Sequence, residues 1–252
     1  MLFRKIPEIN EEAFANVIVK QYYQTAEIFK EYHIEYCCGA RWPLKTVCEM
    51  NGIEFDALQT DLLKSVQVTQ IPGSLPFTDW KLDFLTYYII NIHHQYLRQS
   101  LPAISERLNK FVEEHSKKFA WLSQLQYHFN EFKSSIMPHL LHEEEIIFPY
   151  IRQIARAFES KESYAGLLVR TLRKPVEELM HHEQELLAGI LNQLRELTNN
   201  YTAPSNGCTS HYLVFCLLNE LDDNLMQHFY LENSILFPRA IQLEKELLGL
   251  SV

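Results

Sequence analysis

One phrase occurs twice in this chain, and each copy places a histidine four residues before a glutamate. The first copy holds His139 and Glu143, the second holds His228 and Glu232, and a Phe-Pro pair follows each glutamate. Side chains four apart on an α-helix lie on one face, so each copy directs an imidazole and a carboxylate to the same point. Imidazole suits iron, zinc or copper, and a carboxylate has two oxygens that can reach two metals. Two such helices facing each other therefore predict a carboxylate-bridged pair of metal ions.

Two adjacent histidine pairs, His93-His94 and His181-His182, recur at nearly the same interval as the doubled phrase. The pattern is that of a duplicated helical hairpin, in which each half gives one histidine from its first helix and a histidine and a glutamate from its second. With a rotation of about 100° per residue, His182 falls at the edge of its helix's apolar stripe and His181 nearly opposite. We favour His182 as the ligand, with His181 as the alternative. The broader stripe of the first helix does not discriminate between its two histidines.

The elements that must position these residues are helices. Long segments have apolar residues at three- and four-residue spacing, and the chain has only seven glycines. We therefore predict an all-α protein whose larger part is an antiparallel up-down four-helix bundle. The Pro- and Gly-containing stretch from Val66 to Thr78 cannot continue a helix. The expected parts are a small helical domain over 1–66, a linker over 67–77 and a bundle over 78–252, with long helices at about 78–116, 118–159, 161–197 and 210–248.

Composition argues against several kinds of partner and compartment. The formal charge of −9 should repel nucleic acid and anionic lipid. No stretch approaches the roughly 20 apolar residues of a membrane span. The first twenty residues have no apolar block followed by a small-residue cleavage site, and five cysteines, an odd number, fit a reducing compartment. We expect a cytoplasmic protein that binds neither nucleic acid nor membrane.

The adjacent pair Cys37-Cys38 is the candidate reactive group of the small domain. Adjacent cysteines rarely form a strain-free disulfide with each other, so they contribute little as a crosslink. We interpret them as candidate catalytic thiolates, the alternative being two small residues in a tight turn. Cys208, at the start of a helix, is the only other cysteine whose thiolate the sequence favours.

These features together resemble the hemerythrin-like di-iron proteins, and with the Cys-Cys segment they resemble the family of iron–sulfur cluster repair di-iron proteins. The resemblance covers nearly the whole chain. Its motifs are Glu35-Tyr36-Cys37-Cys38-Gly39, the Leu101-Pro102 pair after His94, the two phrases His139 to Pro149 and His228 to Pro238, Thr198-Asn-Asn-Tyr-Thr, and Cys208-Thr209.

The resemblance implies a ligand set. In that family the first-helix histidine stands seven residues before the leucine of the Leu-Pro pair, which selects His94 over His93. It implies two non-haem irons per chain, bridged by the two glutamates and an oxo group, and held by His94, His139, Glu143, His182, His228 and Glu232. This chain departs from the family in two places. It is two or three residues longer between the third-helix histidine and Thr198, which keeps His181 as an alternative, and Ala40 stands where glycine is common.

Function follows from the same resemblance. It implies repair of iron–sulfur clusters damaged by oxidants or nitric oxide, with iron–sulfur proteins as clients, nitric oxide or oxygen as small-molecule ligands, and a homodimer as the assembly. Imidazole and carboxylate ligands without a thiolate independently favour iron over copper(I), and zinc more often takes four ligands at a single site. Two alternatives remain: an enzyme that reduces nitric oxide, and a simple oxygen- or iron-binding protein of hemerythrin type. The last alternative gives Cys37 and Cys38 no role.

Overall fold

The computed structural model describes residues 9–37, 40–66, 75–172 and 176–249, without the side chains of residue 172 and of residues 176–183. The chain divides into two compact units, Met1–Gly73 with Tyr201–Leu217 and Ser74–Asn200 with Leu218–Val252. All regular elements in the described ranges are helices, so the predicted all-α class is confirmed. Among these helices, none is both long and apolar enough to cross a membrane.

The first unit is built from short helices around one apolar core. Leu44, Leu58 and Leu62 are fully buried there, and Leu213 from the later segment packs among them. This contact explains why residues 201–217, which the sequence analysis assigned to the bundle, group with the N-terminal helices. The expected linker lies mostly outside the described residues. The helices of the N-terminal part are α1 (Ala15–Gln21), α2 (Thr25–Glu31), α3 (Leu44–Asn51) and α4 (Phe55–Ser65).

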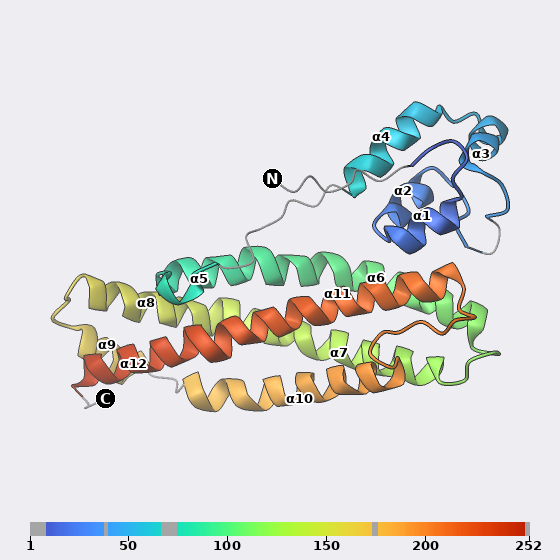
Figure 1. Ribbon diagram of the computed structural model, residues 1–252. Helices are drawn as coiled ribbons and strands as arrows, with labels where there is room; N and C mark the ends of the chain where they lie inside the picture. The colour runs from blue at the N-terminus through green and yellow to red at the C-terminus, as the bar shows by residue number, and fades with distance from the viewer. Residues whose placement is uncertain (1–8, 38–39, 67–74, 173–175, 250–252) are drawn as a thin grey trace. The chain divides into compact units, whose positions relative to one another are not determined.

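The second unit is the expected up-down bundle, in which successive long helices run antiparallel (Figure 1). Its core is apolar on the inward faces of all four, with Leu85, Phe148, Ile151 and Leu236 fully buried. The helices are α5 (Leu82–Tyr88) with α6 (Gln95–His115), α7 (Leu122–His142) with α8 (Phe148–Glu159), α9 (Ala165–Leu172) and α10 (Val176–Leu197), and α11 (Thr209–Leu231) with α12 (Phe237–Leu248). The division between the units falls within α11.

Within the described ranges, three of the long helices contain a π-helical segment, which the sequence analysis did not predict. The segments are Ile89–His94 between α5 and α6, Glu143–Ile147 between α7 and α8, and Glu232–Leu236 between α11 and α12. The last two end just before a Phe-Pro pair. Proline has no N–H to give the carbonyl four residues earlier, and its ring crowds that carbonyl, so the α-helical pattern is interrupted in the preceding turn. In the sequence, a Phe-Pro pair thus accompanies the second and the third π segment.

Several helices end in a left-handed residue followed by a bond that closes the last turn. At the end of α2, His33 has φ 55° and Ile34 N–H bonds to the Phe29 carbonyl at 2.8 Å. At the end of α3, Gly52 has φ 65° and Ile53 N–H bonds to the Cys48 carbonyl. Both are Schellman endings, in which an apolar residue after the turn folds back on the helix. The ending of α2 thereby directs the chain toward Cys37.

Candidate metal centre

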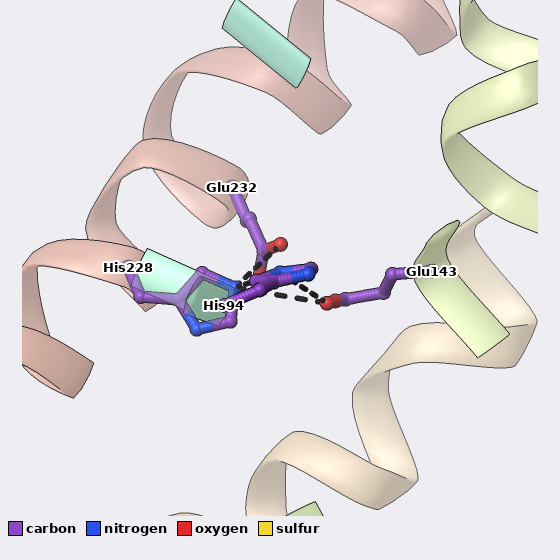
Figure 2. Close-up of side chains that lie close together, drawn as sticks. All are labelled: His94, Glu143, His228 and Glu232. Carbon is purple, nitrogen blue, oxygen red and sulfur yellow. Dashed lines mark hydrogen bonds and ion pairs between the residues drawn. The ribbon is translucent and has the colours of Figure 1, made fainter. Parts of the chain in front are cut away.

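Among the side chains that the structure describes, four buried ones from three helices converge in the bundle (Figure 2). They are His94, Glu143, His228 and Glu232, and one potential ligand atom from each lies within 4.8 Å of the others. All four have fully buried side chains. The His94 and His228 Nε2 atoms are 3.3 Å apart, so both imidazoles direct the same nitrogen toward one point.

The two oxygens of Glu143 face different histidines. Oε1 lies 3.0 Å from Nε2 of His139, one helical turn earlier on α7. Oε2 lies 3.3 Å from Nε2 of His94 and 3.6 Å from Nε2 of His228. A carboxylate with a separate nitrogen donor beside each oxygen has the arrangement needed to bridge two cations.

His94 is held from its other ring nitrogen. Its Nδ1 donates to Glu144 Oε1 at 2.6 Å, and Arg98 pairs with both oxygens of Glu144 at 2.9 Å. With the proton of the neutral imidazole on Nδ1, the lone pair is on Nε2, which faces Glu143 and His228. A carboxylate on the outer nitrogen is the usual support of a metal-binding histidine.

Glu232 is oriented on both sides. Its Oε1 lies 2.9 Å from Nε2 of His228 on the preceding turn, and its Oε2 accepts a hydrogen bond from Gln184 Nε2 at 3.2 Å. Gln184 lies on α10 and is buried. Among the described side chains of the third long helix, the Gln184 amide therefore contacts the Glu232 carboxylate.

Each π segment adjoins this cluster. His94 is the last residue of the first segment, while Glu143 and Glu232 are the first residues of the other two. A π turn shifts the helix face by a fraction of a turn, so side chains on either side of it point in directions that a regular helix would not allow. In each His-x-x-x-Glu pair, the histidine thus lies in the last turn of a regular α-helix, and the glutamate begins the π segment that follows.

Two buried carboxylates, Glu143 and Glu232, lie close together in the cluster and shift the pKa values of their neighbours. Burial, together with the charge of Glu143, raises the pKa of Glu232. Burial acts in the same direction on Glu143, but the neighbouring histidines, His139 foremost, outweigh it and hold its pKa well below the usual range. Burial alone would lower the pKa of His228, yet the two carboxylates raise it to about 10. A positive charge is therefore strongly favoured at this point.

A further observation supports the fit of these residues to a metal ion. Within the described residues, neither oxygen of the buried Glu143 has a well-aligned hydrogen-bond donor. Burying a carboxylate without such donors costs several kcal/mol on the usual scale, about 2–7 kcal/mol for a neutral polar group and more for a charge. The imidazole nitrogens lie 3.0–3.6 Å from the carboxylate oxygens. A cation bound between these atoms would remove the free-energy cost of burying the carboxylate.

The other predicted site residues lie as follows. His139 stands beside the four-residue cluster through Glu143. His93 does not face the cluster's carboxylates: its Nδ1 lies 3.2 Å from Asn224 Oδ1, its ring stacks on His228, and burial lowers its pKa to about 4. The side chains of His181 and His182 lie outside the described residues, so the third-helix ligand stays a prediction. Cys37 is described in the first unit, whereas Cys38 lies outside the described residues.

The sequence analysis did not single out two supporting residues, Arg98 and Gln184. A signal existed for Arg98, which stands four residues after His94 and so shares its helix face. Gln184 stands two residues after His182 and had no such signal.

Two known protein families match parts of this sequence. The family model described as "Hemerythrin HHE cation binding domain" matches residues 85–240, which is more than half of the chain. The chain belongs to the hemerythrin HHE family. The described ligand candidates all fall inside the matched range. A second family model, a domain of unknown function called DUF542, matches residues 16–66 of this hemerythrin-family chain.

Similar proteins carry a shared name. The chain is 27% identical over 221 residues to the iron-sulfur cluster repair protein YtfE of Edwardsiella ictaluri, covering 86% of this chain and 91% of that protein. It is 26% identical over 218 residues to the protein of the same name from an Enterobacter strain, and 27% identical to that of Escherichia coli O81, with the same shares covered. The similarity to these relatives thus extends beyond the hemerythrin match and includes at least part of the N-terminal match.

Proposed function

We propose that this chain is a di-iron protein that takes part in the repair of iron–sulfur clusters damaged by oxidative or nitrosative stress. The observation that carries the proposal is the buried Glu143, whose two oxygens face histidines of different helices. The names of relatives that match over 86% of the chain support the client chemistry. The proposed irons are held by His94, His139, Glu143, His182, His228 and Glu232.

Histidine and carboxylate ligands without a thiolate suit iron. A pair of irons held here would supply labile iron and open coordination positions for a small ligand such as nitric oxide or oxygen. The protein's own part is to fix the ligands before the metal arrives. Glu144 and Arg98 hold His94 in one tautomer, and Gln184 limits the rotation of the Glu232 carboxylate.

Phe148 and Phe229 pack against two of the cluster's histidines. The Phe148 ring stacks on His94 with 5.6 Å between the ring centroids, and the Phe229 ring stacks on His228 at 5.5 Å. Phe148 is fully buried and Phe229 nearly so. Apolar rings beside the imidazoles lower the local dielectric constant, which strengthens the attraction between the carboxylates and a bound cation.

The proposal extends to partners. Cys37 and Cys38 would present thiolates to an iron–sulfur client protein for iron transfer or for exchange of a nitrosyl group. We further propose a cytoplasmic homodimer. The negative net charge of −9 makes nucleic acid and anionic membranes unfavourable partners.

Metal analysis of the purified protein, with an ultraviolet-visible spectrum, tests the proposal. We expect about two irons per chain, the number that paired ligand motifs of this kind hold. The double variant Glu143→Ala with Glu232→Ala should lose the metal, whereas Glu145→Ala, which changes an exposed neighbour, should keep it. Protein without transition metal, or a double variant with unchanged metal content, would contradict the di-iron site.

A cell-based assay tests the repair function separately. Recovery of a cluster-containing enzyme after exposure to nitric oxide should require the chain, and should fail with the double glutamate variant but not with Glu145→Ala. Anaerobic incubation of the reduced protein with nitric oxide provides the comparison with the enzymatic alternative. Sustained production of nitrous oxide would favour a nitric oxide reductase, and a stable nitrosyl without gas would favour repair.

A further inference from the structure

Two cysteines that are far apart in the sequence meet in the first unit. Cys37 follows α2, and Cys208 directly precedes α11, in the segment that packs with the N-terminal helices. The Ser210 hydroxyl donates to Cys37 Sγ at 3.0 Å. The Cys208 thiol is also close enough to hydrogen-bond to the Cys37 sulfur. The Cys37 sulfur therefore lies beside two donors, a hydroxyl and a thiol.

The environments of the two sulfurs differ. Hydrogen bonds from two donors favour the thiolate of Cys37. Burial raises the pKa of Cys208, the backbone N–H groups of His211 and Ser210 oppose that shift, and the hydrogen bond to Cys37 raises it further. Cys208 is thus the protonated partner and Cys37 the acceptor. This asymmetry is that of a nucleophilic thiol beside a thiol held in reserve.

The two residues also differ in burial from the cysteine of the apolar core. Cys37 and Cys208 are partly exposed, whereas Cys48 is buried in the core of the same unit. Burial raises the pKa of Cys48, as expected for an inert thiol. Two cysteines that serve only to fill space would lie among apolar neighbours, as Cys48 does. The pair beside Ser210 instead lies among polar donors at the first turn of a long helix.

The alternative partner for Cys37 is its neighbour in sequence. A disulfide between adjacent cysteines requires a strained eight-membered ring, because the two Cβ atoms cannot easily reach the preferred geometry. Cys208 approaches Cys37 from a distant part of the chain and is free of this constraint. Of these two candidates, Cys208 is therefore the better partner for a reversible bond.

We propose that Cys37 and Cys208 form a reversible dithiol–disulfide pair, with a small-molecule disulfide such as oxidised glutathione as the oxidant. In the first step the Cys37 thiolate attacks one sulfur of the oxidant, forming a mixed disulfide and expelling one glutathione thiolate. In the second step Cys208 loses its proton to that leaving thiolate or to water, attacks Cys37 Sγ and expels the second glutathione. Two protein thiols and one glutathione disulfide thus become one protein disulfide and two glutathione thiols. The pair does not depend on the metal centre of the proposed function.

The experiment oxidises the full chain with glutathione disulfide under anaerobic conditions, blocks the remaining thiols and maps the peptides without reduction. We expect a crosslinked peptide containing Cys37 and Cys208, with loss of two thiols per chain. In Cys208→Ser, the second step is blocked, so Cys37 should remain as a mixed disulfide with glutathione. Cys38→Ser and Cys216→Ser should still form the crosslink. Absence of the crosslink in the parent chain, or a disulfide between Cys37 and Cys38 in its place, would overturn the proposal.

The role of Ser210 has its own readout. Ser210→Ala should slow alkylation of Cys37 by about three- to tenfold at neutral pH, because the thiolate loses the hydrogen bond from the Ser210 hydroxyl and becomes less favourable. Ser210→Thr keeps the hydroxyl and should restore the rate. Circular dichroism checks that each variant is folded. Equal alkylation rates in the parent chain and the folded Ser210→Ala variant would remove the argument that Cys37 is the attacking thiolate.

Discussion

His94 and Glu144 are joined by a 2.6 Å hydrogen bond from Nδ1 to Oε1, on the side of the imidazole that faces away from the buried cluster. Glu144 is itself paired with Arg98 on the helix that carries His94. The bond therefore fixes both the tautomer and the ring orientation of His94 before any metal binds.

Glu144→Ala should weaken metal binding without emptying the site. Loss of the carboxylate that supports a metal-binding histidine typically costs about 10- to 100-fold in affinity. We expect a loss of that size, measured by competition with a chelator of known affinity. Arg98→Ala should have a smaller effect in the same direction, since it leaves the bond between His94 and Glu144 in place. An affinity unchanged in Glu144→Ala would mean that packing against Phe148 alone orients His94.

Pro238→Ala should lower metal affinity through the backbone. Alanine has an N–H that can bond to the carbonyl four residues earlier, inside the π segment Glu232–Leu236. A regular helix formed there would rotate Glu232 relative to the residues that follow. We expect about a tenfold loss of affinity at unchanged helical content, measured by chelator competition and circular dichroism.

Pro102→Ala is the matched control for that prediction. Pro102 stands inside α6, is exposed and adjoins no π segment. Its replacement should leave metal affinity unchanged and raise the free energy of unfolding by about 1–3 kcal/mol, because proline in a helix interior is costly. If both proline variants keep full affinity, core packing rather than proline maintains the π segments.

The sequence was sufficient for the helical class and for the spacing of the candidate ligands. Periodic apolar residues and the doubled His-x-x-x-Glu phrase are local patterns, and local patterns can be read from one sequence. The hydrogen bond from His94 to Glu144 could not be read in this way, because Glu144 lies on another helix and the relative rotation of the two helices depends on tertiary packing. The approach of Cys208 to Cys37 depends on long-range packing for the same reason.

Helix ends show the same limit at the level of single residues. Glycine after a helix predicts a left-handed ending, and Gly52 behaves so. His33 and Lys161 occupy the same kind of position at the ends of α2 and α8, with φ of 55° and 52°. Neither residue type predicts that conformation, because a side chain disfavours it. At these positions the bonds and packing of the ending outweigh the intrinsic preference of the residue.

Lys161→Gly should therefore stabilise the protein. Lys161 is exposed, and the turn is closed by the bond from Glu162 N–H to the Ala157 carbonyl at 3.0 Å, which glycine retains. Glycine removes the left-handed penalty of about 1–2 kcal/mol but adds freedom to the unfolded chain, so the net gain is about 0.5–1 kcal/mol. Chemical denaturation measures it. Lys161→Val should lose stability, and a Val variant as stable as the Gly variant would show that the turn is not strained.

Arg195→Ala should cost more than an ordinary surface substitution. Arg195 on α10 pairs through two nitrogens with both oxygens of Asp222 on α11, at 2.6 and 2.5 Å, and the Asp222 side chain is only 7% exposed. Removing the guanidinium leaves a nearly buried carboxylate without its cation, which in a fully buried pair costs about 3–5 kcal/mol. Because Arg195 is itself 28% exposed, we expect about 2–3 kcal/mol in the free energy of unfolding.

The double variant Arg195→Met with Asp222→Leu separates the cost of an orphaned charge from the worth of the pair. Apolar residues of similar size remove both charges, so no carboxylate is left buried without a partner. The double variant should unfold within about 1 kcal/mol of the parent chain, and clearly above Arg195→Ala. Should it be as unstable as the single variant, the loss would come from packing between α10 and α11 rather than from the unpaired Asp222. Urea denaturation of all three proteins decides between these outcomes, because the same two helices are compared throughout.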